Sequence, residues 1–122
     1  MKKCMFLSSA LMFLLFCSLH AQTVTNTTWR GYFPAPINDS ITIHWQKDSS
    51  FVTDSKGKVL IKSTYTREKN AITFIDFGGM YACGVKGTYV ISIKENILVF
   101  TLLSDACIPR NTFAKMKWRK IK

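Results

Sequence analysis

The sequence predicts an all-β protein: an up-and-down antiparallel β-barrel of eight or nine short strands with one disulfide. Beyond an apolar N-terminal segment, runs of five to eight β-branched and aromatic residues alternate with short polar turns, which is typical of antiparallel strands. No stretch is convincingly helical. Eight strands of about eight residues joined by turns of about four account for the length. Closure would remove exposed strand edges, although an open sandwich has the same strand count.

The N-terminal segment has the features of a secretory signal peptide. Lysines at positions 2 and 3 precede an almost wholly apolar stretch at residues 5–16, and Ala21 supplies a small residue for cleavage. The apolar stretch is shorter than the roughly 20 residues that span a bilayer as a helix. We therefore expect a signal peptide at 1–21, no transmembrane anchor, and one mature domain at 22–122 in the periplasm or outside the cell.

The four cysteines divide between the leader and the domain. Cys4 and Cys17 precede the cleavage site, so Cys83 and Cys107 are the pair left in an oxidising compartment, which predicts a structural disulfide. They are 24 positions apart, and closing such a loop stabilises a fold by roughly 3 to 4 kcal/mol. The alternative of reactive thiols lacks a Cys-x-x-Cys motif. A lipoprotein acylated at Cys17 is disfavoured by the bulky Phe16 before it.

Strand predictions for the first half follow from alternation and turn residues. Ile41, Ile43 and Trp45 share one face of their strand, while the residues between them are polar. Pro34 ends the first strand because it has no N–H for a ladder. A Ser-Lys-Gly turn at 55–57 predicts a hairpin. The strands are expected at residues 28–33, 41–46, 51–54 and 58–66.

The second half continues the pattern, with turns at 67–70 and 95–96 and a glycine break at 78–79. Strands are expected at residues 71–77, 80–85, 87–94, 97–104 and about 113–121, with 105–111 irregular. Residues 97–104 are apolar on both faces, which predicts a strand covered on both sides or packed beneath a loop.

Several motifs resemble the lipocalin-like, or calycin, family of small secreted bacterial proteins. They are Trp29 with Gly31, Cys83 followed by Gly-Thr-Tyr at 87–89, and the Asp-x-Cys-x-x-Arg element at 105–110. The resemblance implies an up-and-down barrel whose interior holds a small apolar molecule. It also implies that Trp29 closes the barrel floor near a basic residue from the chain end.

Arg110 and Arg119 are the candidates for that basic residue. Asp105 is spaced to pin the loop before the last strand through Arg110, by a charge-assisted hydrogen bond. The predicted barrel-closing residues are Trp29, Asp105, Arg110 and Arg119.

Aromatic residues are numerous for a chain of this size, and inward-facing ones either fill the core or line a pocket. If the barrel holds a small apolar or amphipathic ligand, the expected lining residues are Trp45, Tyr65, Phe74 and Tyr89.

The net positive charge of the mature domain indicates an alternative function. Without the two leader lysines, 15 basic residues face 7 acidic ones, so the mature domain carries +8 with histidine neutral. Near the C-terminus, Lys115, Lys117 and Arg119 alternate with apolar residues and predict a basic stripe on one strand face. Such a stripe either resists edge pairing or binds an acidic glycan, lipid headgroup or other polyanion. We expect no sequence-specific nucleic-acid binding, and a monomer.

An enzyme is the least expected class. His44 is the one histidine after the leader, and no Gly-x-Ser-x-Gly elbow accompanies it. Asp76 and Asp105 could form a carboxylate pair of the glycosidase kind, although such residues more often bond turn amides. A zinc site would need more donors than one histidine and two paired cysteines. We therefore expect no catalytic residues, no metal and no cofactor.

Overall fold

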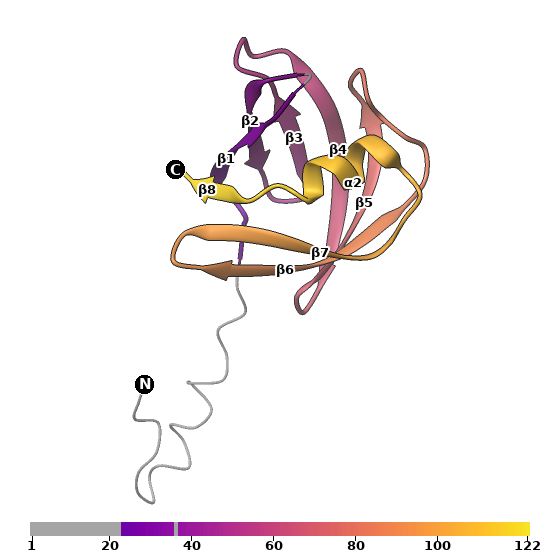
Figure 1. Ribbon diagram of the computed structural model, residues 1–122. Coiled ribbons are helices and arrows are strands. Elements are labelled where there is room, and N and C mark those ends of the chain that lie inside the picture. The colour runs from indigo at the N-terminus through magenta and orange to yellow at the C-terminus, as the bar shows by residue number, and fades with distance from the viewer. Residues whose placement is uncertain (1–22, 36) are drawn as a thin grey trace, which may run out of the picture.

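The fold is a closed antiparallel barrel in which each strand pairs with its sequence neighbours and β8 returns to β1 (Figure 1). The computed structural model describes residues 23–35 and 37–122. The expected signal peptide and the lipoprotein alternative at Cys17 lie outside the described residues. The strands are β1 (Thr28–Phe33), β2 (Asp39–Trp45), β3 (Ser49–Thr53), β4 (Val59–Glu68), β5 (Ala71–Gly78), β6 (Gly87–Lys94), β7 (Ile97–Asp105) and β8 (Trp118–Lys120). The predicted up-and-down barrel of eight or nine strands is thus confirmed, with eight strands.

Alternation along the strands places the core. In β2, Ile41, Ile43 and Trp45 are buried, whereas Thr42 and His44 between them are less enclosed, as a strand covered on one face requires.

Turn residues with positive φ reverse the chain between strands, including Gly57, with φ of 85°, and Asn96, with φ of 63°. The β6–β7 turn has positive φ at both central residues, as two-residue hairpins prefer.

Closure depends on a short last strand that approaches β1 closely. Trp29 and Arg30 pair with Lys120 and Arg119, and β8 also pairs with the start of β7. A Cβ at Gly31 would lie 2.7 Å from Cε of Met116. Gly31 therefore leaves room for the chain that leads into β8.

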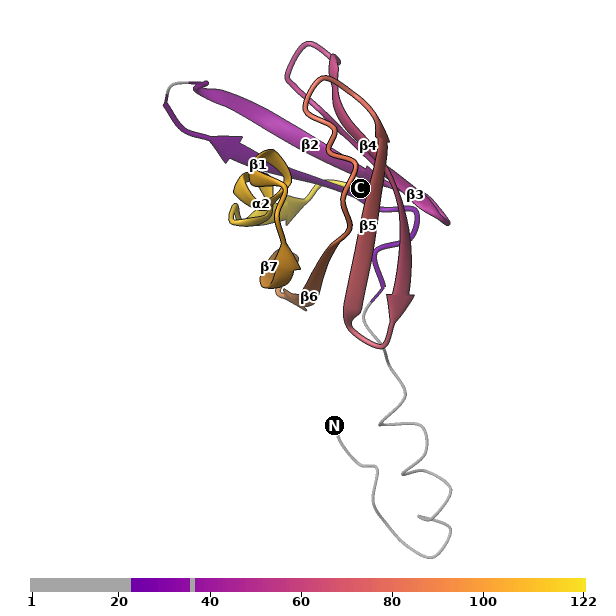
Figure 2. The same cartoon turned by 90° about the vertical axis from the view of Figure 1, so that its right-hand side faces the viewer.

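A helix, α2 (Ile108–Ala114), lies between β7 and β8, so the expected irregular segment at 105–111 and strand from 113 were wrong in part. Cys107 precedes it in an extended conformation, and proline stands in its first turn, where the missing N–H costs nothing. Figure 2 shows α2 beside β7 and β1, and the ring of Phe113 lies 5.3 Å from that of Phe33 in β1. The helix therefore buries one face against the barrel, while the last strand is only three residues long.

Two further strand predictions were wrong. Residues 80–85 form a loop, because Gly79 turns the chain with φ of 100° and the Tyr81 N–H donates to the carbonyl of Leu60. β7 is not covered on both faces: Leu102 is 46% and Leu103 57% exposed. β8 pairs only with the first two residues of β7.

The predicted disulfide between Cys83 and Cys107 is confirmed, with an S–S distance of 2.06 Å. It joins the loop after β5 to the residue before α2. Among the described residues, no helix is both long and apolar enough to cross a membrane.

Candidate functional site

Four aromatic side chains predicted to line a ligand pocket lie together inside the barrel. Trp45 contacts the rings of Tyr65 and Phe74 at centroid distances of 5.1 and 5.7 Å, and Phe74 lies 6.0 Å from Tyr89. Phe100, which was not among the predicted four, packs 5.8 Å from Tyr89. These side chains are at most 9% exposed. The five rings therefore form a mutually packed core.

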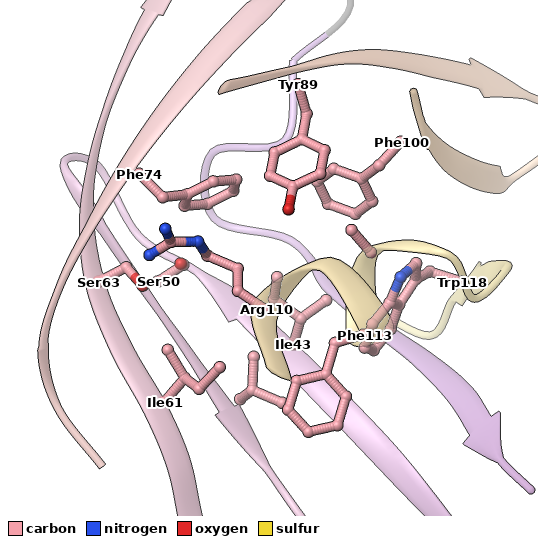
Figure 3. A pocket seen from close by; sticks show the side chains of 12 residues that line it. Ile43, Ser50, Ile61, Ser63, Phe74, Tyr89, Phe100, Arg110, Phe113 and Trp118 are labelled. Carbon is pink, nitrogen blue, oxygen red and sulfur yellow. The ribbon is translucent and has the colours of Figure 1, made fainter. Parts of the chain in front are cut away.

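A partly open cavity of about 40 Å³, which we call the interior cavity, lies between the barrel strands and α2 (Figure 3). Phe74 and Tyr89 line this interior cavity, whereas Trp45 and Tyr65 do not. Small-molecule sites commonly measure roughly 300 to 1,000 Å³, and a dry cavity of about 150 Å³ accommodates benzene. The interior cavity is therefore large enough for a few water molecules and too small for a lipocalin-type ligand.

A few buried polar side chains stand among the mostly apolar side chains that line the interior cavity. Trp118 lines it, and its buried Nε1–H has no partner in the protein. Ser50, also buried, contributes a hydroxyl to the same wall. A buried water needs two to four polar partners, and the mostly apolar wall of the interior cavity offers few.

Arg110 lies at the centre of a buried polar cluster. Its Nε donates to Oδ2 of Asp105 at 2.7 Å and its Nη2 to Oδ1 at 2.8 Å, a bidentate geometry. Nη2 also donates to the carbonyl of Val85 at 2.7 Å. Nη1 lies 2.7 Å from Oδ1 of Asp76, at an angle that makes the contact an ion pair rather than an aligned hydrogen bond.

The two carboxylates of this cluster are held from further directions. Ser63 Oγ donates to Asp76 at 2.6 Å, and the Cys83 N–H donates to its second oxygen at 2.9 Å. The hydroxyl of Tyr89 donates to Asp105, and so does the Cys107 N–H, at 2.9 Å. We call Arg110, Asp105, Asp76, Tyr89 and Ser63 the Arg110 cluster.

Electrostatics favour the charged forms of Asp105 and Arg110 and the protonated form of Tyr89. Burial raises the pKa of Asp105, but hydrogen bonds from Arg110 and Tyr89 outweigh burial and leave that pKa below its usual value. Burial together with the hydrogen bond to Asp105 raises the pKa of the Tyr89 hydroxyl. Burial lowers the pKa of Arg110, but its two carboxylate partners more than compensate and raise it. The carboxylates are therefore occupied partners of one arginine, which is not the arrangement of a glycosidase acid–base pair.

The other side chains considered for catalysis or metal binding have partners within the protein. His44 stacks on Phe51 at 4.4 Å, its Nε2 lies 3.1 Å from the hydroxyl of Thr53, and burial lowers its pKa. Asp76, Cys83 and Cys107 bring an oxygen and two sulfurs within 4.8 Å of one another. The two sulfurs are bonded to each other, so they are not thiolate ligands.

The predicted barrel-closing residues lie in three separate parts of the structure. Asp105 and Arg110 meet in the Arg110 cluster. Trp29 is 1% exposed, and its Nε1 donates to the Thr27 hydroxyl at 2.7 Å. Arg119 points outward and is exposed. Of the two arginines that the resemblance offered, the structure therefore buries Arg110.

The structure separates Lys115 from the other residues of the predicted basic stripe and places Arg30 beside them. Lys115 follows the last residue of α2 as its C-cap, away from β8. Lys117 and Arg119 are exposed, and Arg119 stands directly opposite Arg30 in the β1–β8 ladder. We call Arg30, Lys117 and Arg119 the basic face. Arg30 could have been found from the sequence, because the first and last strands of an up-and-down barrel are neighbours.

Two surface grooves meet on the basic face. One measures about 440 Å³ and is bordered by Arg30 and Tyr32, and the other measures about 520 Å³ and is bordered by Lys94 and Glu95. Both are lined by Lys117 and Arg119. We call these two adjoining grooves the trough.

Comparisons of the chain with protein families, with curated proteins and with solved structures found no match.

Proposed function

We propose that this protein is an exported, non-enzymatic β-barrel with a filled core whose basic face binds an acidic polysaccharide. The observation that carries the proposal is the pairing of Arg30 with Arg119 across the β1–β8 ladder. Like charges directly opposite each other destabilise a sheet. Lys117, two residues before Arg119, adds a third cation on the same outer side of the chain. An anionic group bound between them would relieve this repulsion.

Charge distribution supports the same conclusion. Among the described residues, the recorded ion pairs are the two that Arg110 makes with Asp76 and Asp105. The Arg110 cluster thus removes one cation and two carboxylates from the mature total of 15 and 7, leaving 14 cations and 5 carboxylates. The outside of the barrel therefore carries +9, one more than the whole domain, and attracts polyanions over about a Debye length.

Shape favours a chain over a bilayer as the partner. The two grooves adjoin at Lys117 and Arg119, which line both, so a linear polymer that crosses these two cations would contact both grooves. Acidic polysaccharides place carboxylate or sulfate groups at regular intervals along such a polymer. A membrane surface, in contrast, would meet the rims of the trough first.

The apolar-ligand role expected from the lipocalin-like resemblance receives less support inside the barrel. The interior cavity of about 40 Å³ is smaller than any ordinary ligand. A non-enzymatic role agrees with the carboxylates of the Arg110 cluster being fully engaged. Export agrees with the disulfide, since such bonds persist in oxidising compartments.

The test is affinity for heparin, used as a defined sulfated polysaccharide, measured by calorimetry over a range of NaCl concentrations. The variant R30Q/K117Q/R119Q removes the basic face. A matched control, K47Q/K56Q/K58Q, removes three exposed lysines from turns elsewhere and has the same net charge. We expect the first variant to reduce the slope of log affinity against log salt by about 2, from roughly 0.7 counterions per neutralised charge on a flexible polyanion. The control should keep most of the slope.

Equal losses in both triple variants would contradict the proposal, because net charge rather than the basic face would then govern binding. Vesicles containing anionic phospholipid provide the second comparison. Binding to vesicles that is tighter than binding to heparin, and that depends on the same three residues, would replace the polysaccharide with a membrane.

A further inference from the structure

A second site lies outside the barrel, where α2 faces the first strand and the loop that follows β5. This α2 cleft has a volume of about 200 Å³. Its walls include Phe33, Tyr81, Ile108, Pro109, Thr112 and Phe113. Ile108 is 77% exposed, so an apolar side chain at the entrance is left in water. The α2 cleft is open to solvent on one side, so a ligand in it would be only partly buried.

Phe113 forms a wall shared by the α2 cleft and the interior cavity. Phe113 lines the interior cavity together with Ile43 and Arg110 (Figure 3). The ring also meets Phe33 and Tyr81 edge to face, at 5.3 and 6.2 Å. One aromatic side chain therefore separates the outer site from the space behind it.

The walls of the α2 cleft are preformed. Tyr81 belongs to the loop after β5, and the disulfide Cys83–Cys107 fastens that loop to the start of α2. The Tyr81 N–H is held by the carbonyl of Leu60 at 2.9 Å, and Pro109 stiffens the first turn of the helix. A site whose walls are fixed in advance loses little conformational entropy when a ligand binds.

The lining chemistry defines the ligand class. No charged side chain lines the α2 cleft. Thr112 supplies the one side-chain hydroxyl apart from that of Tyr81, and it is already donated to the carbonyl of Ile108 at 2.8 Å. Aromatic walls attract the edges and faces of other aromatic rings. A charged ligand would lose its hydration here without gaining a partner.

We propose that the α2 cleft binds a small uncharged aromatic molecule of one or two rings. This site is independent of the basic face and goes beyond the proposed polysaccharide binding. Phe113 forms the floor of the site, Ile108 and Pro109 its helical wall, and Tyr81 the wall opposite. The ligand lies outside the barrel, so the small interior cavity does not limit it.

Indole is the probe, titrated into the disulfide-bonded domain and followed by amide chemical shifts. We expect saturable binding with a Kd on the order of 1 mM for a ligand of this size. The shifted amides should cluster in α2, at Phe33 and around Tyr81. Absence of saturation, or shifts centred on another part of the barrel, would overturn the proposal.

Two substitutions localise the site without disturbing the core. Ile108→Lys places a charge at the entrance from a side chain that is already exposed, and it should weaken indole binding by about fivefold or more. Leu103→Lys, at a 57% exposed position outside the α2 cleft, is the matched control and should leave the Kd unchanged. Equal effects of the two substitutions would assign indole binding to general surface hydrophobicity and contradict the α2 cleft.

Discussion

Arg110 holds Asp105 through two parallel hydrogen bonds, from Nε at 2.7 Å and from Nη2 at 2.8 Å. The two residues are five positions apart, on either side of the disulfide cysteine that precedes α2. Their contact fixes the helix to the end of β7. Because Arg110 also meets Asp76 of β5, one side chain joins two strands and a helix.

Replacing Arg110 by methionine should lower the free energy of unfolding by about 3 to 5 kcal/mol, because two buried carboxylates lose their cation. Urea denaturation measures the change. The triple variant R110M/D76N/D105N should be less destabilised than R110M, since it removes the unpaired charges as well. A loss below about 1 kcal/mol in R110M, the size of an ordinary surface substitution, would contradict a structural role for this cluster.

Gly87 and Gly84 offer a matched pair of alanine substitutions. A Cβ at Gly87 would overlap the carboxylate of Asp105, whereas a Cβ at Gly84 would meet nothing within 4 Å. Gly87→Ala should therefore displace Asp105 and cost about 1 to 3 kcal/mol, as overpacking does. Gly84→Ala should be neutral or slightly stabilising. Similar thermal stability for the two variants would show that Asp105 does not need the space left by Gly87.

Acid should destabilise the fold through Asp105. The pKa of Asp105 is below its usual value in the folded state, so the unfolded chain binds more protons near its own pKa of about 3.9. The stability that this carboxylate contributes is fully present above that pH and is lost as pH falls through the folded-state pKa. Urea midpoints measured from pH 6 to pH 2 should decline mainly below about pH 4. Asp105→Asn should flatten part of that decline, and an unchanged pH profile would contradict the assignment.

The disulfide should account for a large share of the stability. Replacing Cys83 and Cys107 together by alanine should lower the free energy of unfolding by roughly 3 to 4 kcal/mol, by the loop-closure argument for 24 residues. It should also weaken indole binding, because the bond fastens the loop that carries Tyr81. Intact-mass measurement before and after reduction verifies that the parent protein contains the bond. Retention of full stability without it would show that the Arg110 cluster alone fixes the loop.

Local patterns in the sequence were sufficient to predict most of the barrel. Alternation at Ile41, Ile43 and Trp45 placed β2, and the glycine turn at 57 placed the β3–β4 hairpin. The disulfide followed from the position of the other two cysteines. Helix α2 escaped prediction because it has seven residues, among them proline, threonine and phenylalanine, which do not favour helix interiors. Its stability comes from burying Arg110 and Phe113 rather than from local propensity.

The candidate sites depended on contacts between distant parts of the chain. Asp76 and Arg110 are 34 positions apart, so their ion pair has no local signature. The interior aromatics could equally fill a core or line a pocket, because both environments use the same residue types. The ring-to-ring distances decide between these outcomes. The Arg30–Arg119 pair requires the closure of β1 on β8, which strand count alone does not establish.

The proposal that the basic face holds an acidic polysaccharide is tested most directly by mapping amide chemical shifts during titration with a sulfated tetrasaccharide. We predict that the largest shifts fall on Arg30, Lys117 and Arg119 and extend along the trough toward Lys94. These shifts should vanish when NaCl is raised to about 0.5 M, because the interaction is screened. Shifts confined to the lysine-bearing turns at positions 47, 56 and 58, or no shifts at low salt, would contradict the account.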